Sequence, residues 1–544
     1  MQLKQRFWPI LAIVTVSLIV AASISWIFKH PYGTSWDEAY YFNQVQADMK
    51  VLETGGVTNV AKAFLLTDRT RPPAYRFFAD SFSYLFGFSP EKVRLLSMAF
   101  FIASLVFIYL GMRCITGLFG SVYAIVFICL CPAIIFPIMV FGTEYCLYLA
   151  IGATLYFLLA SLDQEEESLR NWVGLGLSLG LGALSKATFL LIGGPILLLS
   201  FIISWRKILI GPSPKFLLKA TLLGILIALP WWILNVHHAF ELATYARNFV
   251  RHSIGPPSFE TWVQILSGVA NSVVGLPLTI LVLLTIILSI LGRADNIETR
   301  KNRFQKTVLW ICFLSGIPTI VSFFSSTNNN LRYLTPVVIL FAVGLGVLAD
   351  RTQRMRVPLT TVSAIPIFLG QLIMIVLPSI HPIIFPVHQL RFERPPWIVM
   401  GLLEQWDWNQ LREVARSNGL EKPSISYLGH GRVFNPENIR YAWAVHNEEM
   451  PDVKWLWRYE KGAMDWEKVM KSIKESDIAL TAPNYTGEEI DRQHLDNRHN
   501  NEFAMRLGND SRFKGPLHIT MGRFEPIDIV VFVNSSRFHP APQK

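Results

Sequence analysis

Eleven apolar runs, separated by more polar connections, fill most of the first 380 residues of the chain. About 20 apolar residues cross the hydrocarbon core of a bilayer as one helix, so the pattern predicts a polytopic α-helical membrane domain. Residues 172–205 would form a single helix of roughly 34 residues, more than one crossing needs, so we divide them at Ser185-Lys186. The predicted spans are 8–28, 95–112, 118–141, 145–162, 172–185, 187–205, 216–235, 273–291, 308–325, 333–349 and 357–380.

The character of the chain changes at about residue 390, where the apolar runs stop and charged and turn residues become frequent. Short runs rich in β-branched and aromatic residues predict strands at 423–429, 477–483 and 528–534. Residues 465–476 have apolar side chains at helical spacing and predict a helix. The sequence therefore predicts two domains: a membrane domain over 1–389 and a C-terminal α/β domain over 390–544.

Basic residues in the connections set the expected orientation. If the N-terminus, with Lys4 and Arg6, is cytoplasmic, the basic connections fall on the cytoplasmic side, as the positive-inside rule requires. Eleven crossings then place the C-terminal domain and the first outer loop, residues 29–94, on the extracytoplasmic side. The sequence thus predicts a multi-pass protein of the cell membrane. The basic connections lie at 206–219, 293–306 and 351–356.

The overall composition agrees with this picture. The chain is 52% hydrophobic and only 16% charged, which is unlike a soluble protein of 544 residues. The formal net charge of +10 is explained by basic cytoplasmic loops, so nucleic-acid binding is not predicted. All five cysteines lie in or beside apolar runs, which favours neither a disulfide framework nor a zinc site.

Acidic and basic residues recur at the expected outer ends of the spans. Asp37 and Glu38 follow the first span, and Glu144 lies between the third and the fourth. Transfer of a sugar from a lipid-linked phosphate needs such a mixture, because a carboxylate can act as the general base and cations stabilise the leaving phosphate. The other members of this set are Arg69, Arg71, Arg76, Lys186, His237, His238, Arg332 and Tyr333.

Simpler structural interpretations remain open for these residues. Asp37 and Glu38 could belong to a solvated loop inside an interfacial aromatic belt. Glu144 could stabilise the start of a helix, since acidic residues favour helix N-termini. Lys186 could extend to the interface, and Arg332 could anchor a helix there.

A divalent metal is also left open. Glu38, His237 and His238 are weak candidates for its ligands. The two histidines are adjacent, so on a helix they would point about 100° apart and could not easily bind one metal together.

The sequence resembles the GT-C superfamily of integral membrane glycosyltransferases, in particular the group that contains protein O-mannosyltransferases and bacterial lipid A aminoarabinose transferases. The resemblance runs over most of residues 30–350 and rests on six segments in the order and at the spacing of the family. The C-terminal domain lies outside it. The segments are "WDEAYYFNQ" (36–44), "RPPAYRFFADSFSYLFGFSPEKVRLLS" (71–97), "VFGTEYCLYLAIGATLYFLL" (140–159), "GLGLSLGLGALSKATFLLI" (174–192), "LPWWIL" (229–234) and "SSTNNNLRYLTPVVILFAVGLG" (325–346).

The resemblance implies an inverting transfer from a polyprenyl-phosphate sugar. Asp37 matches the general base, Glu38 is its neighbour, and Glu144 matches a second acid that is Asp in many members. Two cations, Lys186 and Arg332, match positions near the donor phosphate. Arg71 and Tyr333, which stand in the matching segments, complete the predicted donor-phosphate group.

The sequence therefore predicts a membrane glycosyltransferase. Its predicted partners are a polyprenyl-phosphate-linked sugar, hexosyl or pentosyl, and a lipid, glycan or protein acceptor. Two alternatives remain: another transfer of a lipid-linked glycan, such as ligation, and a membrane transporter. A transporter usually shows internal repeats and a site near the membrane midplane, whereas these polar residues are expected at one face.

Overall fold

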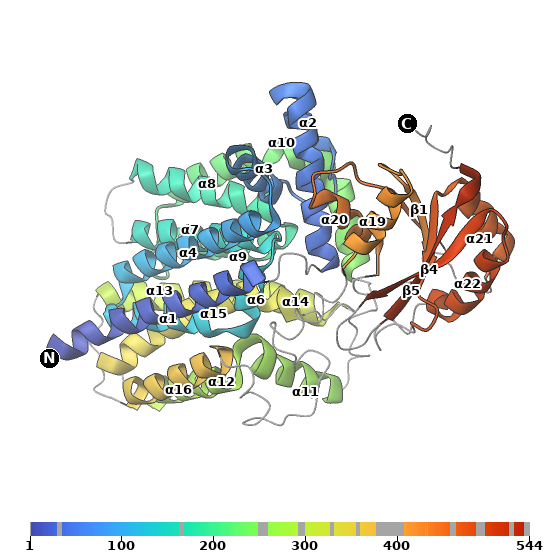
Figure 1. Cartoon of the computed structure of the whole chain (residues 1–544). Coiled ribbons are helices and arrows are strands. Elements are labelled where there is room, and N and C mark those ends of the chain that lie inside the picture. The colour runs from blue at the N-terminus through green and yellow to red at the C-terminus, as the bar shows by residue number, and fades with distance from the viewer. Residues whose placement is uncertain are drawn as a thin grey trace. The chain divides into compact units, whose positions relative to one another are not determined.

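The computed structural model describes residues 2–29, 35–162, 168–247, 259–291, 300–326, 331–354, 359–376, 407–429, 431, 434–456, 464–485, 495–521 and 527–537 (Figure 1). The chain divides into two compact units. The first comprises residues 1–29, 55–82 and 93–397, and the second comprises residues 30–54, 83–92 and 398–544. The boundary predicted at residue 390 lies outside the described residues.

The first unit is helical, as expected for a chain whose backbone polar groups must be satisfied inside lipid. Its helices are α1 (Gln2–Lys29), the end of α2 (Trp36–Leu66), the start of α3 (Ala74–Phe86), most of α4 (Pro90–Ile115), α5 (Leu118–Leu130), α6 (Pro132–Met139), α7 (Glu144–Leu162), α8 (Leu169–Ser185), α9 (Leu190–Trp205), α10 (Pro214–Arg247), α11 (Phe259–Gly268), α12 (Leu276–Leu291), α13 (Arg300–Ser315), α14 (Ile317–Phe324), α15 (Thr335–Arg354) and α16 (Leu359–Val376).

Within the described residues, seven helices are long and apolar enough to cross a membrane. A bent pair, Ile265–Asn271 and Leu276–Leu291, would make an eighth span if it counts as one. The chain is therefore a polytopic α-helical membrane protein, but the count of eleven is not confirmed. The seven are Phe7–Lys29, Pro90–Ile115, Glu144–Leu162, Ala187–Trp205, Pro214–Tyr245, Arg300–Phe324 and Arg332–Gln353.

The remaining predicted spans are shorter helices. The run 118–141 is broken because Pro132, which lacks a backbone N–H, starts a new helix after α5 ends at Leu130. Helix α8 has 17 residues, and α16 is described only over residues 359–376. The division at Ser185-Lys186 is confirmed, because α8 ends at Ser185 and Lys186 is extended.

Helices α8 and α10 lie side by side and approach closely at glycines (Figure 1). A Cβ atom added to Gly180 would lie 2.8 Å from Ile227 Cβ, and one added to Gly224 would lie 2.9 Å from Leu179 Cβ. Small residues permit this approach of backbones in membrane helices. A hydrogen bond from Trp232 Nε1 to the Ala183 carbonyl, at 3.1 Å, adds a polar link.

The C-terminal part of the second unit contains a mixed sheet in the order β2-β1-β3-β5-β4 among its described residues. Strand β1 is parallel to β2 and β3, whereas β5 is antiparallel to β3 and β4. The strands are β1 (Ser424–Leu428), β2 (Asp452–Trp455), β3 (Ile478–Thr481), β4 (Phe513–Met521) and β5 (Ile527–Asn534), and the helices are α19 (Asn409–Ser417), α20 (Pro436–Ala444), α21 (Trp466–Ser472) and α22 (Asn500–Gly508).

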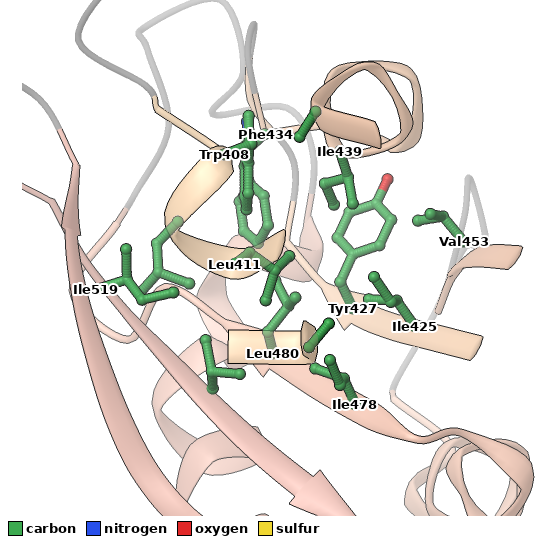
Figure 2. Close-up of a cluster of buried hydrophobic side chains, with 14 of the residues drawn as sticks. Trp408, Leu411, Ile425, Tyr427, Phe434, Ile439, Val453, Ile478, Leu480 and Ile519 are labelled. Carbon is green, nitrogen blue, oxygen red and sulfur yellow. The ribbon is translucent and has the colours of Figure 1, made fainter. Parts of the chain in front are cut away.

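Both faces of this sheet are buried. One face carries Tyr427 and Leu480 in a cluster with Trp408 of the segment before α19, as Figure 2 shows. The opposite face carries Ala479 and Phe532, which pack in a second cluster with side chains of α21 and α22. The alternation has the period of two expected for strands with a core on each side. The three predicted strands and the predicted α/β domain are thus confirmed, while β2 and β4 were not predicted.

Candidate active site

Four of the predicted residues gather where helices of the first unit begin or break. Glu144 is the first residue of α7, and Lys186 lies in the extended break between α8 and the short helix η1 (Ala187–Phe189). Arg332 and Tyr333 belong to another short helix, η4 (Leu331–Leu334), directly before α15. Breaks of this kind free side chains and backbone groups from regular packing, so polar residues can converge there.

The cluster is centred on the Glu144 carboxylate. Lys186 Nζ lies 2.6 Å from Glu144 Oε1, and both side chains are partly buried, at 21% and 13% exposure. Arg332 places a second positive charge within electrostatic reach of the same carboxylate. The Tyr333 ring contacts both cations, because its centroid lies 5.6 Å from Lys186 Nζ and 5.6 Å from Arg332 Cζ.

The charges of this cluster do not cancel. Among these three described residues, Lys186 and Arg332 contribute two positive charges and Glu144 contributes one negative charge, a formal sum of +1. In a partly buried site this surplus attracts an anion more strongly than it would in water. The geometry therefore suits a phosphate oxygen bound by the lysine and arginine side chains.

Neighbouring hydroxyl groups hold this cluster in place. Thr143 Oγ1 donates to Glu144 Oε2 at 3.4 Å. One helical turn after Glu144, the buried Tyr148 hydroxyl donates to Thr335 Oγ1 at 3.0 Å, and Thr335 Oγ1 in turn donates to the Arg332 carbonyl at 2.8 Å. The start of α7 is thus tied to the start of α15. Sequence reasoning missed Tyr148 and Thr335; the available signal was a tyrosine four residues after an acid in an otherwise apolar helix.

The segment that carries Arg71 is ordered by Asp68. The buried Asp68 carboxylate accepts hydrogen bonds from the backbone N–H groups of Thr70 and Arg71 and from the Tyr75 hydroxyl, at 3.0, 3.1 and 3.3 Å. Arg71 Nη1 lies 4.0 Å from Asp68 Oδ2. Sequence reasoning missed Asp68, although an Asp before the Pro-Pro pair is a turn signal.

A hydrogen bond links the segment around Arg71 and Tyr75 to the start of α7, next to Glu144. The Tyr145 hydroxyl donates to the Tyr75 carbonyl at 2.6 Å, and Tyr145 directly follows Glu144 in the chain. Arg71 and Glu144 therefore lie in segments that share a direct polar contact.

Asp37 and Glu38 belong to the second unit. The predicted outer loop 29–94 is largely helical, and the two acids occupy the first turn of α2. Asp37 is half-buried and Glu38 is buried. The Glu38 backbone N–H donates to Ser35 Oγ at 3.4 Å.

The side chains of the two histidines are exposed on the surface of α10. His237 Nε2 and His238 Nδ1 lie 3.1 and 3.2 Å from the carboxylate of Glu241, and their side chains are 80% and 39% exposed. Over the described parts of the chain, no three His, Cys, Asp or Glu side chains form a group that could hold a metal ion.

Part of the chain matches a known protein family. Residues 70–234 match the family described as dolichyl-phosphate-mannose-protein mannosyltransferase. This match contains Arg71, Glu144 and Lys186. No curated protein sequence matches the chain.

Solved structures share the fold over nearly the whole chain. The structure of ArnT from Cupriavidus metallidurans bound to undecaprenyl phosphate matches with a TM-score of 0.59 at 11% identity, covering 95% of this chain and 97% of that one. An Archaeoglobus fulgidus oligosaccharyltransferase matches with a TM-score of 0.51 at 10% identity, covering 96% and 74%. The arabinofuranosyltransferase AftD from Mycobacteria matches with a TM-score of 0.51 at 12% identity, covering 98% and 40%.

The fold is that of membrane-embedded glycosyltransferases. The chain shares the fold of these structures, and residues 70–234 match the mannosyltransferase family; both findings agree with the resemblance found in the sequence. The structural likeness also extends into the C-terminal domain, beyond the residues that carried the resemblance in sequence.

Proposed function

We propose that the chain is an inverting glycosyltransferase that moves a sugar from a polyprenyl phosphate to an acceptor hydroxyl on the outer face of the membrane. The observation that carries the proposal is the cationic cluster of Lys186, Arg332 and Glu144, which has the charge and the partial burial needed to hold a phosphate. The cluster lies at the ends of helices, where a donor held in the membrane would present its phosphate headgroup.

The reaction follows from the chemistry of these residues. Asp37 accepts the proton of the acceptor hydroxyl while that oxygen attacks the anomeric carbon of the sugar. The bond from this carbon to the phosphate oxygen breaks, and the polyprenyl phosphate leaves with the bonding electrons. A single displacement inverts the anomeric centre. Lys186 and Arg332 stabilise the growing charge on the phosphate, and Glu144 keeps both cations in position.

Two further observations support a lipid-linked donor. The matching family is described by its use of dolichyl-phosphate-mannose, and the ArnT structure contains undecaprenyl phosphate. The outward orientation of the site follows from the basic connections expected in the cytoplasm. The acceptor is a lipid, a glycan or a protein, and the sugar is a hexose or a pentose.

The decisive test compares the lipid-linked sugars of a deletion strain with those of its parent by mass spectrometry. The deletion strain should accumulate one polyprenyl-phosphate sugar, and the intact gene should restore the normal pool. A pool that does not change in the deletion strain would contradict the proposal.

A further inference from the structure

The first four turns of α2 pack against the C-terminal domain within the second unit (Figure 1). Trp36 contacts Trp455 at the end of β2, with ring centroids 6.0 Å apart. Asn43, Gln46 and Lys50 follow at spacings of seven, three and four residues, which place all of them on one side of the helix. This stripe is the docking face of α2.

The centre of the docking face is a polar contact with α20. The buried Asn43 side chain donates from Nδ2 to the Glu437 carbonyl at 3.0 Å and to Glu437 Oε2 at 2.9 Å. Arg440 holds the other carboxylate oxygen of Glu437 at 2.9 Å. Beside this contact, Phe42 stacks on Tyr441 with a centroid distance of 5.4 Å.

A second contact lies one to two turns further along α2. Gln46 Nε2 and Lys50 Nζ donate to the Glu448 carbonyl at 3.1 and 2.8 Å. The Glu448 carboxylate is held from within the C-terminal domain by Arg412, whose Nε lies 2.8 Å from Glu448 Oε2, and by Arg416. The turn that receives α2 is therefore fixed in its own domain.

Asp37 directly follows Trp36 on α2. The direction of its side chain therefore changes whenever α2 rotates about its axis. A shift of one residue in the docking would turn Asp37 by about 100° about the helix axis. Even a displacement of about 1 Å in a reacting group can cost about a hundredfold in rate. The contacts of the docking face are therefore in a position to control catalysis.

We infer that the C-terminal domain orients the general base, with Asn43 and Glu437 as positioning residues for Asp37. The inference rests on the proposed function, because it assigns the domain to the transfer step itself. It predicts that disturbing the contact lowers kcat while the Lys186 and Arg332 cations still bind the donor.

The test uses the purified full-length chain with a polyprenyl-phosphate sugar. Asn43→Asp sets a carboxylate against Glu437 and should lower kcat by about 10- to 100-fold, with the donor KM changed less than about threefold. Glu437→Gln keeps an oxygen that can accept from Asn43, so it should lower kcat less than Asn43→Asp does. The double variant removes the repulsion and allows an amide–carboxylate hydrogen bond, so it should be at least about fivefold faster than Asn43→Asp.

Glu502→Gln is the matched control, because it removes an ion pair with Arg506 elsewhere in the same domain and should leave kcat unchanged. Amide hydrogen exchange of residues 36–50 gives a readout that does not need activity. The exchange rate of these amides should be higher in Asn43→Asp than in wild type. It should be lower in the double variant than in Asn43→Asp.

Three results would overturn the inference: wild-type kcat in Asn43→Asp, an equal loss in the double variant, or unchanged exchange over residues 36–50. A wild-type chain that transfers no sugar would instead refute the proposed function. The exchange measurement would then still decide whether the docking face holds α2.

Discussion

In the proposed reaction, the Glu144 carboxylate serves catalysis without reacting itself. Its negative charge attracts two cations that would otherwise repel each other. Lys186 provides a point charge, while Arg332 can offer two parallel donors to phosphate oxygens. The two cations are therefore not interchangeable.

Donor binding should weaken when either cation is removed. Charge-assisted hydrogen bonds contribute about 1.5–3 kcal/mol, so Lys186→Ala and Arg332→Ala should each weaken donor binding by about 10- to 100-fold. Arg332→Lys keeps the charge, loses the paired donors and should remain impaired. Binding of a polyprenyl-phosphate sugar to the purified chain measures this, with Arg113→Ala, an exposed arginine at the end of α4, as control. Wild-type binding by both alanine variants would place the phosphate elsewhere.

Loss of the Asp37 carboxylate should act on the rate and spare binding. Asp37→Asn preserves size and removes basicity, and loss of a general base costs about 10²–10⁴-fold in turnover. Single-turnover transfer should show this loss with donor affinity unchanged. Near-normal turnover would transfer the role to the neighbouring Glu38, for which Glu38→Gln is the parallel variant.

At the scale of elements, helix packing decides where Lys186 sits. Lys186 follows the last residue of α8, and α8 is held against α10 by close contacts at Gly176, Gly180 and Gly224. A side chain at any of these positions would push the two helices apart. The site therefore depends on residues that carry no chemistry themselves.

Gly180→Ala should destabilise the membrane domain by about 1–3 kcal/mol, because the new methyl group meets Ile227 Cβ. Donor binding should weaken as well, since Lys186 moves with the end of α8. The matched control is Gly194→Ala in α9, where an added Cβ has no atom within 4 Å. Thermal unfolding in detergent and donor affinity are the measurements. Equal behaviour of the two variants would mean that the contact between α8 and α10 relaxes at no cost.

At the scale of the whole molecule, the C-terminal domain is stabilised by ion pairs that respond to pH. The hydrogen bond from Arg412 lowers the pKa of Glu448, and the hydrogen bond from Arg512 lowers the pKa of Asp510. A carboxyl whose pKa is lower in the folded state contributes stability above its unfolded pKa and loses it as the pH falls through the folded pKa.

The domain should therefore become less stable as the pH falls below the ordinary glutamate value of 4.5. Hydrogen exchange over residues 407–537, corrected for the intrinsic effect of pH, reports the change. The double variant Glu448→Gln and Asp510→Asn should be less stable at neutral pH and should depend less steeply on pH. Glu449→Gln is the control, because the Glu449–Lys422 pair is exposed and such pairs contribute little. A pH dependence as steep in the double variant as in wild type would contradict the assignment.

Local patterns in the sequence determined the elements of this protein. Apolar runs predicted the helices that are long and apolar enough to cross a membrane, the polar Ser185-Lys186 pair predicted the break after α8, and β-branched runs predicted β1, β3 and β5. Strands β2 and β4 escaped prediction for a physical reason: both lie at sheet edges, where only four residues form β2 and most of β4 is exposed. An edge strand buries too few side chains to give a clear alternation.

Only the tertiary structure decided which polar residues meet. Lys186 reaches Glu144 across 42 positions, and Asn43 reaches Glu437 across 394. The sequence identified Glu144, Lys186, Arg332 and Asp37 as candidates. Charged residues beside apolar runs cost free energy in a membrane and are therefore easy to recognise in a sequence. The sequence did not predict the contact between α2 and the C-terminal domain. A hydrogen bond between distant segments leaves no periodic trace along the chain, since its geometry is set by the packing of whole elements.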